Sequence, residues 1–244
     1  MLLIETLQNH RTKIIESFRE AMEFKAYTDL AFNLAGDFSQ QPTMNHRFIL
    51  GHSSYGSHLG LEDTEVVVSN LPTIFSPIKG DYLLSFVHQN QVSLFEHLFF
   101  DLLKIVITNQ PQSLSGKKQI DYATIFQAES KEELVCKLIE REINEIKYKN
   151  VGEWFNYLYK IVSIPQFSKE EMDKIAEAKA SRDILVHNAG IINQIYVQKS
   201  GSASRFSDGE KIDISGGYTR DVWELLSKVL LIITDAVIEK NSPA

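Results

Sequence analysis

Residues 180–196 read ASRDILVHNAGIINQIY, and this stretch decides the fold that we expect for the chain. At about 100° per residue, a helix formed by it would gather its apolar side chains on one broad side. They fall in two adjacent stripes: Leu185, Ala189, Ile192 and Tyr196, and beside them Ile184, Ile191 and Ile195. Because so wide an apolar arc must be buried, the stretch predicts a central helix of an all-α domain.

The opposite side of this expected helix is polar. Asp183, His187, Gly190 and Gln194 follow one another at spacings of four, three and four, which places them in one strip. Ionisable groups on a largely buried helix need partners or a cleft. We therefore expect the strip to border a polar site.

Length and composition indicate an ordinary globular protein. The chain has 244 residues, 43% hydrophobic and 23% charged, which suits one large domain or one domain with an extension. A formal net charge of −7 provides no general attraction for nucleic acid, so any polyanion would need a local basic patch. Cys136 is the single cysteine, which excludes an intrachain disulfide and a cysteine-rich metal site.

Neither a targeting nor a membrane segment is expected. The N-terminal residues MLLIETLQNHR lack the basic and long apolar regions of a signal peptide. The longest apolar run, residues 229–233, is far shorter than the roughly 20 residues that span a bilayer. We expect a cytoplasmic protein with no membrane partner.

The first 76 residues differ in pattern from the remainder. Residues 2 to about 34 carry apolar side chains at spacings of three and four, which predicts one long amphipathic helix that ends near Gly36. Residues 37–79 contain three prolines, three glycines and one β-like run at 65–68, so we expect irregular structure with one short strand or a buried turn. We divide the chain into residues 1–76, to which we assign no function, and a helical domain over residues 77–244.

Three histidines in the irregular segment do not form a typical metal site. His46, His52 and His58 recur at a spacing of six. Metal ligands on one helical face usually recur at four, and zinc sites usually bring cysteine or acidic ligands at closer spacing. We interpret these histidines as loop residues and expect neither a metal nor another cofactor.

Five helices are expected in the second part. The first follows Gln89 and closes before Pro111; within it, Glu96 is either an ordinary exposed carboxylate or an acid that faces the polar strip. The others cover about 130–147, 151–162, 169–196 and 218–240, and Ser130–Glu133 and Ser168–Glu171 are capping boxes. The predicted fold class is all-α, an antiparallel helical bundle with an N-terminal helical and irregular extension.

Arg182, Asp183, His187 and Asn188 form the candidate site. Asp183 and His187 are four residues apart and share a helix face, so a carboxylate–imidazole hydrogen bond is geometrically natural. Arg182 lies five residues before His187, about 140° around the helix, from where a long guanidinium can bend toward the same cleft. Asn188 adds amide donors, and Gly190 leaves room for a backbone or a ligand.

Cleavage of RNA by its own 2′-hydroxyl is a reaction that uses histidine and arginine without a metal. The imidazole can remove the 2′-OH proton or protonate the leaving 5′-oxygen, and the guanidinium stabilises the charge that develops on the phosphate. One histidine does not readily act as acid and base at once. Two copies of the chain that meet across a twofold axis would supply both roles, so we expect a homodimer.

A family resemblance strengthens this interpretation. The string RDILVHNAGIIN, with Arg182 and His187, resembles the motif helix of the HEPN superfamily, whose signature is Arg-x4–6-His. The string SLFEHLFFDLLKIVITNQPQSL, which contains Glu96, resembles the opening helix of the RiboL-PSP-type HEPN branch, and DGEKIDIS onward also fits. The resemblance covers about residues 77–240. It implies a helical bundle that dimerises, with Arg182 and His187 in the positions of the catalytic pair.

Many HEPN domains are metal-independent endoribonucleases of toxin–antitoxin, abortive-infection and other defence systems. The resemblance therefore implies RNA as the substrate and an antitoxin or regulatory protein as a further partner. Asp183 departs from the family pattern, in which a polar residue, often asparagine, commonly follows the arginine; a carboxylate there weakens phosphate binding while helping to orient the histidine. The local cations that would contact RNA are Lys179, Lys199, Arg205 and Arg220.

Two alternatives stay open. The acidic net charge and Asp183 also suit a catalytically inactive HEPN module that binds RNA, a nucleotide or a protein. In the other alternative, residues 1–76 are a sensor or an antitoxin-like cover for the cleft. Their deletion would then raise activity without unfolding the rest, whereas precipitation would mean that the segment is structural.

Overall fold

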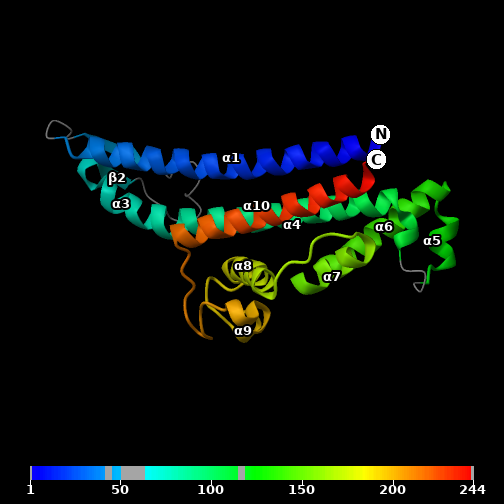
Figure 1. Cartoon of the computed structure of the whole chain (residues 1–244). Helices are drawn as coiled ribbons and strands as arrows, with labels where there is room; N and C mark the ends of the chain where they lie inside the picture. Colours follow the sequence, from blue (N-terminus) through cyan, green and yellow to red (C-terminus); the bar gives the residue numbers. More distant parts are fainter. Residues whose placement is uncertain (1, 42–45, 51–63, 115–118, 243–244) are drawn as a thin grey trace.

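The computed structural model describes residues 2–41, 46–50, 64–114 and 119–242, which form an all-α helical bundle with one short β-ribbon (Figure 1). The α-helices are α1 (Leu2–Ser39), α3 (Leu71–Pro77), α4 (Leu83–Asn109), α5 (Tyr122–Phe126), α6 (Lys131–Lys147), α7 (Val151–Ile161), α8 (Lys169–His187), α9 (Gln194–Ser200) and α10 (Gly216–Asn241). Shorter helical turns are η2 (Val68–Asn70), the π-helical η3 (Ile78–Tyr82), η4 (Pro111–Ser113) and η5 (Gly201–Ala203).

Three long helices, α1, α4 and α10, lie side by side and form one layer, and α6 to α9 lie below it in the view of Figure 1. The direction of α1 is opposite to that of α10, because Arg11 near the start of α1 pairs with Asp235 near the end of α10 at 2.6 Å. Further along α1, the indole Nε1 of Trp223 donates to the carbonyl of Phe18 at 3.0 Å. The two chain ends therefore lie at the same end of the bundle (Figure 1).

A large apolar cluster joins the three long helices to α6, α7 and part of α8, and a smaller one packs α8 against α9 and the loop before α10. The apolar faces of α4 and α10 follow the predicted helical spacing, and the aromatic side chains of α7 pack into the larger cluster. Buried members include Val92, Phe95, Leu98, Phe99, Leu102, Leu103 and Val106 of α4, Trp154 and Phe155 of α7, and Val222, Leu226, Val229 and Ile233 of α10. This burial is the main source of stability in a helical protein, since helix propensity contributes little beside it.

The N-terminal helix contributes to the same core. Leu7, Ile14 and Phe18 of α1 are at most 2% exposed and belong to the cluster formed by α4 and α10. The boundary at residue 76 stays a prediction, but α1 is packed as a structural element rather than as a separate cover.

Residues 71–79, predicted to be irregular, are helical, and the helical structure continues into α4. α3 begins at Leu71, so Pro72 occupies the first turn, where a helix needs no backbone N–H from it. After Pro77 the chain widens into the π-helical η3 and continues into α4. A local change of helical type is one way to accommodate the hydrogen bond that an internal proline removes. The proline count was therefore misleading here.

The predicted strand is confirmed within a small ribbon. β1 (Arg47–Leu50) and β2 (Thr64–Val67) pair antiparallel, with Arg47 opposite Val67. The first helix also continues beyond Gly36 to Ser39.

The expected central helix is interrupted, which corrects the prediction of one helix from 169 to 196. α8 ends at His187, the chain turns through residues 188–193, and α9 begins at Gln194. Ala189 and Gly190 have φ values of 51° and 79°, in the left-handed region that a right-handed helix excludes. The amide N–H groups of Asn188 and Gly190 both donate to the carbonyl of Ile184. Asn and Gly after a basic last turn are typical helix stop signals, so the sequence did contain this end.

Candidate functional site

Helix α8 carries most of the predicted site residues. It begins at the predicted capping box, in which the Ser168 hydroxyl accepts from the Glu171 N–H and the Glu171 carboxylate accepts from the Ser168 N–H. From there the helix crosses under α4 and α10 and presents two polar faces. One contains Lys179, Arg182 and Asp183, and the other contains Glu177 and Ser181.

The first face is a half-buried cluster of charges around Asp183. Its carboxylate lies 3.0 Å from Arg182 Nη1, 3.2 Å from Lys179 Nζ and 4.0 Å from Lys199 Nζ. Arg182 Nη2 also donates to Ser93 Oγ on α4 at 3.4 Å, and the buried Arg182 Nε has no hydrogen-bond partner among the described residues. The predicted arginine is thus directed toward α4, and its charge is largely neutralised by the neighbouring aspartate.

Glu96 faces this cluster through Lys179, which is not a member of the predicted polar strip. Its carboxylate on α4 lies 3.0 Å from Lys179 Nζ, and both side chains are only about one-fifth exposed. Lys179 Nζ also lies 5.6 Å from the centroid of the Trp154 ring, a cation–π distance. Lys179, Arg182 and Lys199 face Glu96 and Asp183, so the cluster keeps one positive charge in excess.

His187 is the last residue of α8, and its side chain is exposed. No hydrogen bond or ion pair joins it to any residue that the structure describes. The predicted bond between Asp183 and His187 does not form, because the Asp183 carboxylate turns toward Lys179 and Arg182 instead. Three apolar side chains near it in sequence, Val186, Ile191 and Ile195, are also exposed.

The predicted polar strip does not exist as a strip, since the helix ends before two of its members. Gly190 lies in the turn after α8, where its carbonyl accepts from the Ile212 N–H, and Gln194 starts α9. Asn188 is the C-cap of α8, and its side-chain amide donates to the Ile191 carbonyl. Its role is therefore to shape the turn. Ile191 and Ile195, predicted to be buried, are exposed for the same reason.

The other predicted RNA contacts divide into two kinds. Lys199 has half of its side chain exposed beside Asp183, whereas Arg220 is exposed at the start of α10 and pairs with Asp221 at 3.5 Å. Arg205 is different, because it is part of an internal network that the sequence did not reveal.

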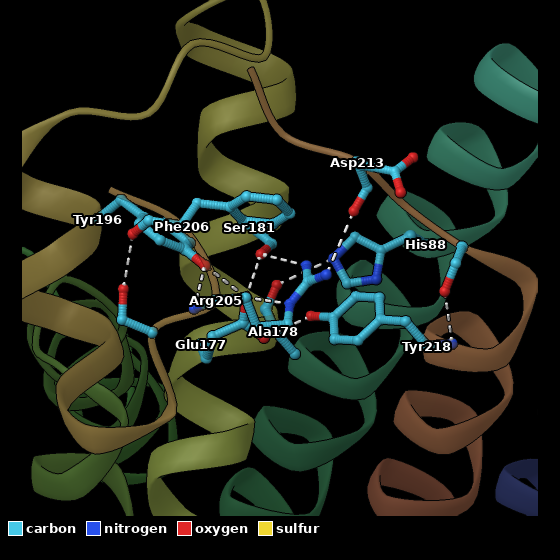
Figure 2. A network of polar contacts seen from close by, with 11 residues as sticks. His88, Glu177, Ala178, Ser181, Tyr196, Arg205, Phe206, Asp213 and Tyr218 are labelled. Carbon is cyan, nitrogen blue, oxygen red and sulfur yellow. Dashed lines mark hydrogen bonds and ion pairs between the residues drawn. The ribbon is translucent and has the colours of Figure 1, made fainter. Parts of the chain in front are cut away.

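This network centres on Glu177, whose side chain is only 3% exposed (Figure 2). Its Oε1 atom accepts from Ser181 Oγ at 2.6 Å, Tyr196 OH at 2.7 Å and Arg205 Nε at 2.9 Å. Its Oε2 atom accepts from Tyr218 OH at 2.6 Å. Four donors from α8, α9, the loop after it and α10 thus satisfy one buried carboxylate, which is the condition for burying a charge without a large loss of stability.

Arg205 is held on several sides. Its guanidinium carbon lies 3.5 Å from the centroid of the Tyr218 ring and 4.8 Å from that of Phe206. Nη2 donates to Ser181 Oγ and Nη1 to the carbonyl of Asp213. Figure 2 shows the guanidinium directed toward Ser181 and the Tyr218 ring, and 27% of the Arg205 side chain stays exposed. Arg205 therefore fixes the loop to α8.

His88 completes the network on α4. The ring is fully buried, its Nε2 lies 3.1 Å from the carbonyl of Ala178, and it packs against the Tyr218 ring at 5.3 Å. Burial lowers the pKa of His88 to about 4, although Glu177 opposes this change, so the imidazole is neutral at pH 7. Burial and the Glu177 charge raise the pKa of Tyr218 well above its usual value, which keeps the phenol protonated and donating.

A sequence signal for this network did exist. Ser181 lies three residues before the buried Ile184, and Glu177 lies four residues before Ser181, so all three lie on one stripe of the helix. A carboxylate on a buried stripe requires partners, but the three donors to Glu177 other than Ser181 are 19, 28 and 41 residues away in the chain. Only the tertiary structure brings them together.

A cavity of about 860 Å³ lies beside the end of α8 but does not include the predicted pair. Its walls come from α1, the start of α4, the turn after α8 and the loop before α10. They include Phe32, Tyr82, Phe86, Leu185, Gly190 and Ile212. Arg182 and His187 are absent from the lining of this cavity.

The described residues contain neither a cluster of metal-binding side chains nor a membrane-spanning helix. Within residues 2–41, 46–50, 64–114 and 119–242, no group of three or more His, Cys, Asp or Glu side chains is placed to hold a metal ion. His46 is exposed, and His52 and His58 lie outside the described residues. Across the same ranges, each helix is either too short or too polar to cross a bilayer.

Comparison with known proteins gives no relative: no protein-family model, no curated protein and no solved structure matches the chain.

Proposed function

We propose that the chain is a metal-independent endoribonuclease of the HEPN type that acts as a homodimer, with Arg182 and His187 as its catalytic pair. The observation that supports this proposal most is that the His187 imidazole has no bonding partner among the described residues. It is exposed at the end of the helix that also bears Arg182, and no described residue bonds to it. An imidazole without a structural partner is free to exchange protons with a substrate.

The surroundings of His187 suit the approach of RNA and of a second copy. Arg182 and Lys179 precede His187 on α8 by about one and a half and about two turns, and Lys199 of α9 faces the same Asp183 carboxylate. A phosphate could take the place of that carboxylate among the three cations. The exposed Val186, Ile191 and Ile195 offer apolar surface around His187 that a second copy would cover. Two copies would then supply one imidazole as base and one as acid.

In this mechanism one imidazole removes the proton of the 2′-OH, and the 2′-oxygen attacks the adjacent phosphorus. The bond to the 5′-oxygen breaks, and the second imidazole protonates that oxygen. The products are a 2′,3′-cyclic phosphate and a 5′-hydroxyl. Arg182 stabilises the charge on the phosphate oxygens during the displacement.

Incubation of the protein with RNA in EDTA tests this proposal. We expect cleavage that leaves 2′,3′-cyclic phosphate ends and that falls at least about 100-fold in His187→Ala. His97→Ala is the matched control, since His97 is also an exposed histidine on a helix. Equal cleavage by the wild type and by a folded His187→Ala protein would remove His187 from the mechanism.

A second candidate function is binding of RNA without cleavage. It is favoured by the engagement of Arg182, whose guanidinium already contacts Asp183 and Ser93. In this case RNA affinity falls steeply with salt, while RNA in EDTA stays intact. If RNA does not bind even at low salt, a protein partner becomes the better assignment, and an antitoxin-like or regulatory protein is the kind that the resemblance suggests.

A further inference from the structure

The second half of α1 carries an apolar face that nothing in the described chain covers. Five large side chains on it keep from 48% (Phe38) to 66% (Tyr27) of their surface exposed. They are Phe24, Tyr27, Leu30, Leu34 and Phe38. Met22 and Phe32, on the other side of the same helix, are partly buried, so this part of α1 is apolar on both sides.

The exposed residues have the spacing of a helix–helix seam. Phe24, Tyr27, Ala31, Leu34 and Phe38 follow one another at three, four, three and four, which is the heptad spacing of two packed helices. Ala31 is exposed as well. When the same spacing is continued, the next position before Phe24 is Glu20 and the next after Phe38 is Gln41, so polar residues bound the seam at both ends.

The order of side-chain sizes along the seam is symmetric. Two large residues, one small residue and two large residues follow one another, with phenylalanine at both ends and Ala31 in the middle. An identical helix laid antiparallel across Ala31 would place Phe24 against Phe38 and Tyr27 against Leu34. The smallest side chain would lie where the two backbones cross most closely. A twofold interface must be complementary to itself, and this order of sizes meets that condition.

The apolar area approaches what a specific dimer needs. An aromatic side chain presents about 150–250 Å², so a half-exposed one leaves roughly 100 Å² for a partner. The three exposed aromatic side chains and two smaller leucines, Leu34 in the seam and Leu30 beside it, together give about 400–500 Å² per copy and about 800–1,000 Å² for two, close to the lower bound for a specific interface. Because α1 is already ordered by its packing on α4 and α10, association of two copies would not cost the conformational entropy of helix formation.

We infer that the seam Phe24–Tyr27–Ala31–Leu34–Phe38 is a self-association surface, on which α1 of a second copy packs antiparallel. This surface is separate from the end of α8, and the inference does not depend on ribonuclease activity. The charged residues at its edge, Glu23 and Asp37, are acidic in both copies. Association through it therefore should not weaken when salt is raised, unlike contacts to RNA.

Sedimentation equilibrium of the full chain tests the surface. We expect Leu34→Glu to reduce the mass of the assembly twofold, whatever other interface the protein uses, and to leave the helical circular dichroism unchanged because Leu34 is 59% exposed. Tyr148→Glu is the matched control, since Tyr148 is 94% exposed on a different helix end, and it should not change the mass. A wild-type monomer at about 100 μM, or equal masses for the wild type and Leu34→Glu, overturns the inference; the seam would then fit a helix of another protein.

Disulfide trapping tests the antiparallel register. In a Cys136→Ser background, which removes the only native thiol, Ala31→Cys should form a disulfide-linked dimer under mild oxidation. Phe24→Cys should not, because antiparallel packing separates the two copies of residue 24 by about 21 Å along the helices. Equal cross-linking of both variants would show parallel packing and contradict the proposed register, and cross-linking of neither would contradict the interface.

Discussion

The two polar faces of α8 show how burial decides what an ion pair does. Glu177 pairs with Arg205 at 2.9 Å and Glu96 pairs with Lys179 at 3.0 Å, so the distances are nearly equal. The Glu177 side chain is 3% exposed and accepts from four donors, whereas Glu96 is 21% exposed and faces a cluster with surplus positive charge. The first arrangement is closed and stabilises the fold, whereas the second is open enough for water to reach its charges. The following experiments test that difference.

Removal of the Glu177 carboxylate should lower the free energy of unfolding far more than removal of the Glu96 carboxylate, and this is the largest difference that we expect. Glu177→Ala leaves Arg205 and two tyrosines without their acceptor inside the protein, and we expect a loss of about 3–5 kcal/mol in the free energy of unfolding. Glu96→Ala should cost about 1 kcal/mol or less, because water can reach its partner. Urea unfolding of both variants measures this, and similar losses would show that the two faces do not differ.

Acid should weaken the closed face through His88. Its pKa is about 4 in the folded chain and 6.5 when unperturbed, so below pH 6.5 the unfolded chain binds the proton first. Stability is thus unaffected by His88 above pH 6.5 and falls as the pH drops to 4, by on the order of 3 kcal/mol. Urea unfolding between pH 7.5 and 4.5 should be less pH-dependent in His88→Asn. An unchanged slope would mean that His88 is not the group responsible; His10, whose pKa burial also lowers, contributes in the same direction.

Two cations near α8 should affect RNA binding differently. Lys199→Ala should lower RNA affinity severalfold at low salt and reduce the slope of affinity against salt by about one charge. Arg205→Ala should cost about 2 kcal/mol of stability but leave that slope unchanged, because its guanidinium is already paired with Glu177 and stacked on the Tyr218 ring. Filter binding at several salt concentrations distinguishes the two, and a reduced slope in a folded Arg205→Ala protein would place Arg205 at the RNA surface after all.

The smallest expected change comes from Asp183. Asp183→Asn removes the negative charge that Lys179, Arg182 and Lys199 share, so RNA should bind about 3- to 10-fold more tightly at low salt. Asp221→Asn is a suitable control, since Asp221 is 70% exposed beside Arg220. A weaker affinity of Asp183→Asn would indicate that the carboxylate orients the cations rather than competing with RNA.

Local signals in the sequence predicted much of the fold. The Ser168–Glu171 capping box, the apolar faces of α4 and α10 and the strand at Thr64–Val67 were readable because each depends on neighbours within a few residues. The end of α8 was missed because the apolar periodicity continues past it, although the left-handed Ala189 and Gly190 stop the helix. The Glu177 network could not be predicted for another reason: most of the donors to Glu177 are distant from it in the chain and meet it only after folding.

The position of α1 has a consequence for synthesis. Its partners Trp223 and Asp235 follow Phe18 and Arg11 by 205 and 224 residues, so the faces of α1 and α4 that α10 covers stay exposed until residues 216–241 have left the ribosome. Contacts of such high sequence separation slow folding and leave apolar surface unprotected in the meantime. For the same reason, a chain that lacks residues 1–76 is expected to precipitate rather than become more active. Growth temperature and chaperone supply should therefore govern the yield of this protein more than any single side chain does.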